Sequence, residues 1–283
     1  MYPDDASFKL ISLANTKCET EPKTKVRYLS NMDHFKTHHA RILRKLKAGL
    51  ATDKKSKFKD PKKYIGTSHR FIGLSSPKQR EIFEAGHGFG HLSLSEQLLI
   101  WNEIWLHSSS FEALSQCLLF VSKHLKSMDS RELWNTTKGW TVKIDNWAHS
   151  DGLSAIYSHL LETETKLVYP QLKRWNNSKN PWERRQSLVA LLEYSKKREK
   201  VLPVNKLFSL VKELLNDKDY FVQKGLGWTL REVGNVYPDE TWEFLLRHCS
   251  KISAVAFSPA VEKLNLKKKE QLKLLRKRSS RAL

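Results

Sequence analysis

The sequence has few of the residues that cross-link a chain, break its helices or hold it in a membrane. Its 283 residues include 3 cysteines, 11 glycines and 9 prolines. Cys18, Cys117 and Cys249 are far apart and odd in number, which excludes a disulfide framework and a CxxC metal pair and indicates a reducing compartment. No run approaches the roughly 18 apolar residues of a membrane span. The polar N-terminus does not resemble a signal peptide, so we expect a cytoplasmic, nucleoid-associated protein.

Motifs for nucleotide and metal chemistry are also absent. The sequence contains no GxxxxGK[ST], GxGxxG, HExxH or GxSxG segment. The 11 histidines are scattered, and the densest group, His34, His38 and His39, lacks the spacing and acidic neighbours of a metal site. We interpret these histidines as surface residues and expect no metal and no organic cofactor.

Acidic residues are outnumbered. Fifty Lys and Arg against thirty Asp and Glu leave a net charge of +20, with a pI near 9.8. This surplus favours a polyanionic partner, because each cation that replaces a phosphate counterion adds affinity that is independent of sequence. We therefore favour a nucleic-acid partner over a basic protein without one.

Helix signals occur along most of the chain, and β-alternation is absent. Capping boxes at residues 93–96, 109–112 and 129–132 predict helix starts. Asn180, followed by a proline, predicts another.

Two helix pairs, at residues 172–194 and 207–233, resemble each other. Their equivalent caps, Asn180 and Asp219, are 39 residues apart, near the ~40–47 of HEAT and armadillo-like repeats. We expect Gly234 to end the second capped helix. The predicted fold class is all-α, a superhelical solenoid of HEAT-like antiparallel helix pairs with a concave basic DNA-binding face.

Two lysine-rich segments interrupt this pattern. Residues 54–63, with six lysines and one acid, are expected to form an exposed loop. The chain end, with nine basic residues and one acid from residue 263 onward, is either a solvated helical tail or a DNA-clamping arm. We expect an N-terminal extension (1–33), a repeat domain (34–265) and a basic tail (266–283).

A carboxylate, a guanidinium and two indoles recur at about the spacing of one helix pair. Trp147 and Asp151 are four residues apart on one helix face, Arg185 follows Asp151 by 34 residues, and Trp228 follows Arg185 by 43. In an array of paired helices they would meet on the concave side. There a carboxylate can stabilise an oxocarbenium ion at a deoxyribose C1′, indoles can pack on the sugar, and an arginine can hold phosphates.

Each of these residues also has a purely structural interpretation. Asp151 could be a surface acid, and Arg185 could be a buried ion-pair partner of Asp151 or Glu193. The two indoles could belong to the core. A helical solenoid could also be a protein–protein scaffold, although the charge argues against that.

These segments resemble the AlkD-type DNA alkylation repair glycosylases, a family of HEAT-like repeat proteins. Residues 221–232 (FVQKGLGWTLRE) resemble the family's F-[IV]-Q-K-A-I-G-W-x-L-R-E segment. Residues 182–185 (WERR) resemble its W-x-x-R, 147–151 (WAHSD) its W-D-x-V-D, and 71–80 (FIGLSSPKQR) its F-G-[IV]-x-x-P-x-[LI]-R. The resemblance covers about residues 35–265.

The resemblance implies a monomeric enzyme that excises cationic N3- and N7-alkylated purines from duplex DNA in base excision repair. The base would leave by hydrolysis of its N-glycosidic bond, without entering a pocket. Asp151 would be the catalytic carboxylate, Trp147 and Trp228 would contact the deoxyribose, and Arg185 would hold the backbone. The further DNA-binding residues would be Arg184, Lys224 and Arg231.

The sequence departs from the family pattern close to these residues. Ala148 stands where many members carry a second Asp, His149 and Ser150 replace the usual residues, and Gly225 stands in place of Ala. Some relatives keep the fold and only bind DNA. A non-catalytic protein that binds damaged or branched DNA is therefore the alternative, although the retained Asp151 favours catalysis.

Overall fold

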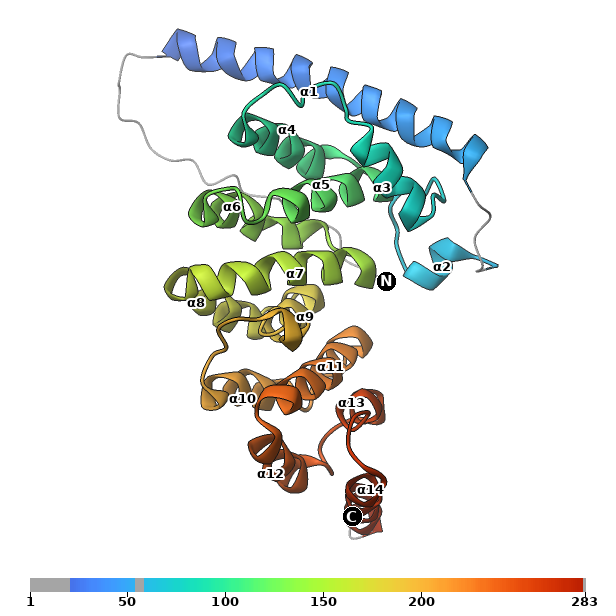
Figure 1. Ribbon diagram of the computed structural model, residues 1–283, viewed down its shortest axis with the longest axis vertical. Coiled ribbons are helices and arrows are strands. Elements are labelled where there is room, and N and C mark those ends of the chain that lie inside the picture. Colours follow the sequence, from blue (N-terminus) through green and yellow to red (C-terminus); the bar gives the residue numbers. More distant parts are fainter. Residues whose placement is uncertain (1–20, 54–58, 282–283) are drawn as a thin grey trace, which may run out of the picture.

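The computed structural model describes residues 21–53 and 59–281, and within these ranges the chain is helical with no strand. Figure 1 shows the helices stacked in succession, from α1 at one end to α14 at the other. The predicted all-α solenoid is thereby confirmed. No helix in the described ranges is long and apolar enough to cross a membrane.

The helices have the following bounds. They are α1 (Glu21–Gly49), α2 (Pro61–Ile65), α3 (Ser76–Glu84), α4 (Leu94–His107), α5 (Phe111–His124), α6 (Ser130–Thr137), α7 (Trp147–Thr163), α8 (Thr165–Asn176), α9 (Pro181–Val189), α10 (Val204–Glu213), α11 (Tyr220–Val236), α12 (Pro238–His248), α13 (Ala254–Ala260) and α14 (Leu266–Arg281). Short 3-10 turns are η1 (Leu50–Thr52), η2 (Lys138–Lys143) and η3 (Ser195–Lys197).

Local hydrogen bonds at the helix starts explain where most helices begin. Ser93 and Glu96 form the predicted capping box of α4. Asp129, Asn180 and Asp219 accept backbone N–H groups at the starts of α6, α9 and α11, as predicted. These caps satisfy donors that the first helical turn leaves without partners.

Three of the local predictions are wrong. In the box predicted at 129–132 only Asp129 caps the helix, and the Glu132 carboxylate accepts the hydroxyl of Ser95 instead. The box at 109–112 does not form, because Ser110 alone caps α5 and the Glu112 carboxylate accepts the N–H groups of Ile72 and Gly73 instead. Gly234 does not end α11, which continues to Val236. Gly234 lies near the Thr241 side chain of α12, where a Cβ would make an ordinary contact at 3.4 Å.

The lysine-rich segment and the histidine group also differ from expectation. Residues 54–58 lie outside the described ranges, but Pro61 already begins helix α2. His38 and His39 are half-buried, because their rings pack against Phe89 and Phe35. Residues 1–20, which include Cys18, lie outside the described ranges.

Helix α11 is the central element of the C-terminal half, where it packs against α9, α12 and α13. Its approach to α13 is close: a Cβ on Gly227 would lie 2.2 Å from the Ala256 carbonyl oxygen. Only glycine permits this contact. It brings the Pro259 end of α13 to the same side of the stack as Trp228.

Candidate functional site

The predicted carboxylate, guanidinium and two indoles meet in one cavity. Its volume is about 630 Å³, and α2, α7, α9, α11 and α13 all contribute to its wall. The lining residues are Tyr64, Trp147, Asp151, Arg185, Tyr194, Tyr220, Phe221, Lys224, Trp228, Arg231 and Pro259. The four residues that the repeat spacing placed together therefore line one cavity, and α2 and α13 complete its wall.

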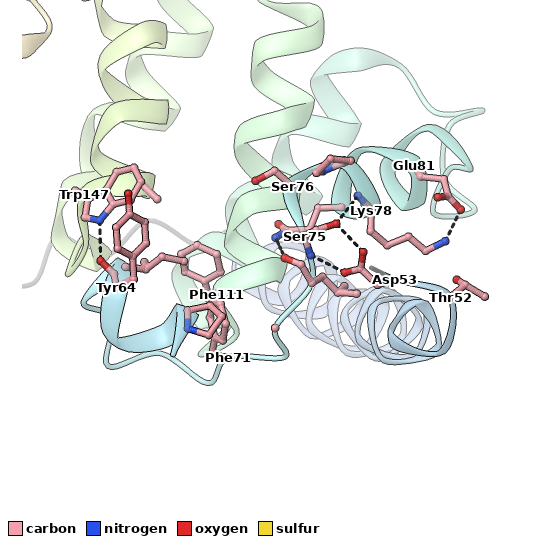
Figure 2. A pocket seen from close by; sticks show the side chains of 17 residues that line it. Thr52, Asp53, Tyr64, Phe71, Ser75, Ser76, Lys78, Glu81, Phe111 and Trp147 are labelled. Atoms are coloured by element: carbon pink, nitrogen blue, oxygen red, sulfur yellow. Dashed lines mark hydrogen bonds and ion pairs between the residues drawn. The ribbon is translucent and has the colours of Figure 1, made fainter. Parts of the chain in front are cut away.

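The start of α7 supplies Trp147 and Asp151. Asn146 caps this helix by accepting the N–H of His149 at 2.9 Å, which fixes the first turn. The Trp147 indole N–H donates to the Tyr64 carbonyl oxygen at 3.2 Å, and the Tyr64 ring meets the indole edge-on at 5.6 Å (Figure 2). Trp147 is thus held from the side by α2.

Arg185 is buried and binds the Asp151 carboxylate. Its Nη2 lies 2.6 Å from Asp151 Oδ1, its Nε donates to Ser150 Oγ at 3.1 Å, and its Nη1 donates to the Phe221 carbonyl at 2.7 Å. The arginine side chain is 4% exposed, whereas the Asp151 side chain is 30% exposed. Burial raises the pKa of Asp151, and Arg185 opposes that rise.

The structural interpretation of Arg185 as an ion-pair partner of Asp151 therefore fits the geometry. Its three bonds tie α9 to α7 and α11 and leave the guanidinium buried. The bond from Arg185 to Asp151 Oδ1 fixes the position of the carboxylate in the cavity wall.

Helix α11 forms another part of the wall. The Trp228 ring lies 5.3 Å from the Tyr194 ring, and Lys224 is exposed without an ion pair in the described ranges. Arg231 is already paired, with Glu232 at 3.1 Å and with Glu262 at 2.8 Å. Lys224 is therefore freer than Arg231 to bind an anion.

Arg184 is the one predicted site residue that does not line the cavity. Its Nε lies 2.6 Å from Asp217 Oδ2, and its Nη1 donates to the carbonyls of Ser178 and Lys179. These bonds fasten the start of α9 to the turn before α11. Arg184 therefore stabilises the fold beside the cavity and does not line the cavity itself.

Comparison with known proteins identifies the relationship that this geometry suggests. Residues 44–264 match the model of the DNA alkylation repair enzyme family, which is most of the chain. The chain belongs to the DNA alkylation repair enzyme family. A solved structure described as a predicted DNA alkylation repair enzyme from Enterococcus faecalis matches with a TM-score of 0.62 and 16% identity, covering 75% of this chain and 100% of that one. No curated protein matched significantly.

The residues that depart from the family pattern beside Asp151 face away from the cavity. Ser150 accepts hydrogen bonds from Arg185 and Gln186. His149 is buried, with its ring stacked 4.3 Å from that of Phe111, and burial lowers its pKa to about 3. These two departures alter the support of this family member's site and leave its carboxylate in place.

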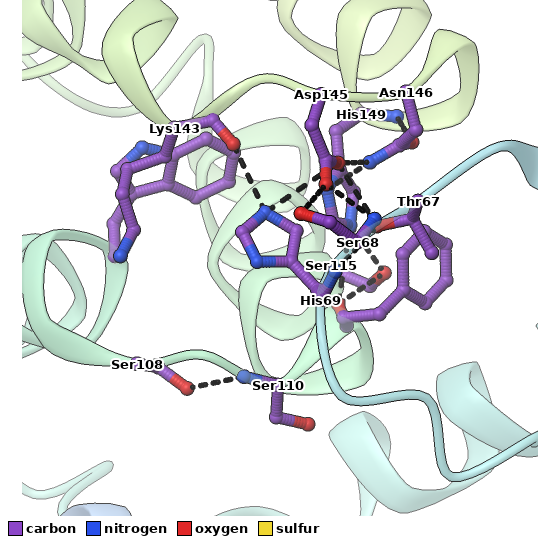
Figure 3. A network of polar contacts seen from close by, with 12 residues as sticks. Thr67, Ser68, His69, Ser108, Ser110, Ser115, Lys143, Asp145, Asn146 and His149 are labelled. Carbon is purple, nitrogen blue, oxygen red and sulfur yellow. Dashed lines mark hydrogen bonds and ion pairs between the residues drawn. The ribbon is translucent and has the colours of Figure 1, made fainter. Parts of the chain in front are cut away.

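A polar network joins the segment after α2, at Thr67 and Ser68, to the start of α7 (Figure 3). Asp145 accepts from Thr67 Oγ1 at 2.9 Å and from the N–H and hydroxyl of Ser68 at 2.6 and 2.7 Å. Burial alone would raise the pKa of Asp145, but hydrogen bonds, including that from Asn146, lower it to about 2. The network places Tyr64 over Trp147.

Sequence reasoning missed the three tyrosines of the cavity, Tyr64, Tyr194 and Tyr220. Tyr64 is 83 residues from Trp147 in sequence and contacts it directly, since its carbonyl oxygen accepts the indole N–H. Tyr194 and Tyr220 lie inside the two similar helix pairs, at 172–194 and 207–233, but neither was among the predicted site residues. No periodic signal marks any of the three.

A second cavity of about 690 Å³ shares Tyr64 and Trp147 with the first one (Figure 2). Its polar groups are largely satisfied within the protein: Asp53 accepts both donors of Ser75, and Lys78 pairs with Glu81. It contains none of the carboxylate–arginine pair. The smaller cavity is therefore the candidate site of this family member.

Proposed function

We propose that the protein is a monofunctional DNA glycosylase that removes N3- and N7-alkylated purines from duplex DNA. Membership of the DNA alkylation repair enzyme family supports a role in repairing alkylated DNA. The net charge of +20 supports a polyanionic substrate.

One observation carries the proposal. The Asp151 side chain is 30% exposed and lines the same cavity as the Trp147 and Trp228 indoles, while a buried arginine holds its carboxylate in place. A carboxylate fixed before the reaction stabilises developing positive charge without having to reorganise.

The chemistry needs little beyond this carboxylate. As the bond between C1′ and the purine nitrogen breaks, its electron pair goes to the base, which is cationic beforehand and leaves neutral. Asp151 stabilises the cationic sugar and orients a water molecule. The water oxygen then bonds to C1′, and its proton passes to Asp151 or to solvent.

The neighbouring aromatic and basic groups have separate roles in this proposal. The indoles of Trp147 and Trp228 pack on the sugar and favour its positive charge through their π faces. Lys224, exposed and without an ion pair in the described ranges, neutralises a backbone phosphate. No protonation of the base is required, so a base pocket is unnecessary.

The test is release of N7- and N3-methylated purines from alkylated duplex DNA by the wild type and by Asp151→Asn. We expect the variant to lose about 10²–10³-fold in the single-turnover excision rate, because a fixed charge at the reacting centre is lost. Its duplex affinity should remain within a few-fold of the wild type.

Asp217→Asn is the matched control, because it removes the same charge from the pair beside the cavity. It should excise at close to the wild-type rate below its unfolding temperature. If neither the wild type nor any variant releases base while duplex binding is tight, the protein is a non-catalytic DNA binder and the proposal is wrong.

A further inference from the structure

Helix α14 is a basic element that the family match does not include. The match ends at residue 264, and α14 begins at Leu266. The helix is docked on the end of the stack (Figure 1): Leu272 is fully buried, and Arg276 donates to the carbonyls of Cys249 and Ile252. The Arg276 guanidinium also lies 4.4 Å over the Phe257 ring. These contacts fix the rotation of α14 about its axis, and so determine which of its side chains are exposed.

One flank of α14 is lined with cations. Lys269, Lys273 and Lys277 follow one another at intervals of four residues, so they lie in a row along the helix, and Arg276 borders this row. Lys273 and Lys277 are exposed and form no hydrogen bond or ion pair within the described ranges. The row spans about 12 Å at ~1.5 Å per residue, the rise of three to four base pairs of duplex DNA.

A groove joins this flank to the candidate site. It has a volume of about 520 Å³, and its lining includes Lys218, Tyr220, Lys251 and Arg276. Tyr220 also lines the candidate cavity, so the two hollows adjoin. Lys218 and Lys251 are exposed and have no ion pair within the described ranges.

A second chain of contacts links the two regions. Arg231, which lines the candidate cavity, pairs with Glu262 at 2.8 Å, and Lys269 donates to the Glu262 carbonyl at 2.8 Å. The one acid in the groove, Asp217, is already paired with Arg184. The surface from Lys224 through the groove to α14 therefore presents mainly unpaired positive charge.

We propose that the groove and the Lys269–Lys277 flank of α14 bind the DNA backbone away from the lesion. One strand would leave the candidate cavity past Tyr220, with its phosphates along Lys218 and Lys251, and continue beside Lys273 and Lys277. The proposal takes its ligand, duplex DNA, from the proposed function. Of the two interpretations of the basic chain end, a solvated helical tail and a DNA-clamping arm, we therefore favour the second.

The test compares two double variants of the full chain that remove equal charge. Lys273→Gln with Lys277→Gln removes cations from the flank that is bordered by Arg276, the α14 residue that lines the groove. Lys267→Gln with Arg278→Gln removes two exposed cations from the other flank of α14 and is the control. Affinity for an undamaged 24-base-pair duplex is measured by fluorescence anisotropy across a range of salt concentrations.

The plot of log affinity against log salt should become shallower by about 2 units for the first variant, since each lost phosphate contact contributes ~0.9. The control should keep the wild-type slope. The proposal would be overturned if the two variants had the same slope, or if they lost the same amount of duplex affinity.

The two proposals fail in different ways. If the wild type excises alkylated purines and the Lys273/Lys277 variant keeps the wild-type slope, the glycosylase stands and α14 is a solvated helix. If the slope falls but no base is released, α14 binds DNA on a protein that is not a glycosylase.

Discussion

Two adjacent arginines on α9 form ion pairs of opposite character. Arg185 is 4% exposed and Asp151 is 30% exposed, so in this pair the carboxylate faces solvent. Arg184 is 20% exposed and Asp217 is 7% exposed, so in that pair the carboxylate is the buried member. Both pairs have a shortest N–O distance of 2.6 Å. The two pairs are equally short, so what decides whether a carboxylate can reach a substrate is which member of the pair is buried.

The surroundings of the two pairs explain the inversion. Asp217 accepts the N–H of Asp219 in the turn before α11, which draws its carboxylate inward. Asp151 stands on the first turns of α7 and has Arg185 as its only hydrogen-bond donor in the described ranges. One carboxylate therefore closes a turn, and the other keeps an oxygen free for chemistry.

The largest expected effect comes from breaking each pair at its arginine. Arg185→Gln should destabilise the protein by about 3 kcal/mol, the low end for a broken buried pair, because Asp151 retains some solvent. It should also lower excision at least tenfold, since the carboxylate loses its orientation. Arg184→Gln should cost about 1–3 kcal/mol, because Asp217 keeps its backbone donor, and should leave excision within about twofold.

Urea unfolding and single-turnover excision measure these two quantities. Both rates are taken well below the unfolding midpoint of the less stable variant. Equal excision by the two variants would show that Arg185 has no more to do with the reaction than Arg184.

The second prediction concerns the acid limb of the pH–rate profile. If Asp151 acts as proposed, excision requires its ionised form. Burial raises the pKa of this carboxyl, and Arg185 opposes the rise. The rate should therefore fall, as the pH is lowered, at a pH above the ordinary aspartate pKa of about 3.9. Arg185→Gln removes the opposing charge, so its acid limb should move to still higher pH, and Arg184→Gln should leave the limb where it is. A wild-type acid limb at or below that ordinary pKa would contradict this assignment.

Local rules predicted the helix starts well, because a cap is a hydrogen bond between residues two or three apart. Ser93, Asp129 and Asp219 all cap as predicted. The same rules failed for Glu112, whose partners, Ile72 and Gly73, are 40 and 39 residues away. A carboxylate with a better distant partner does not complete a local box.

The site was predictable to the extent that it follows the repeat. Trp147, Asp151, Arg185 and Trp228 line one cavity because stacked helix pairs bring residues one repeat apart to the same face. Which of two adjacent arginines faces the cavity was not predictable from spacing. That depends on a carboxylate from elsewhere in the chain, Asp151 on α7 or Asp217 in the turn before α11, and each arginine pairs with the one on its own side.

The smallest expected effect tests how closely Arg185 is packed. A Cβ on Gly225 would lie 3.1 Å from Arg185 Nη1 and 3.1 Å from Val189 Cγ2, closer than ordinary contact. Gly225→Ala, which installs the residue of the family pattern, should therefore shift Arg185 by a few tenths of an ångström and lower excision by less than tenfold. Its stability should change little, because the helix propensity of alanine, about 1 kcal/mol, offsets the crowding.

Gly234→Ala is the control on the same helix, since its Cβ would meet only Thr241, at 3.4 Å. It should gain stability, by up to about 1 kcal/mol, and leave excision unchanged. If Gly225→Ala also leaves excision unchanged, Arg185 can move without carrying Asp151 with it. The burial of this arginine would then matter for folding alone, and the contrast between the two pairs would lie entirely in their carboxylates.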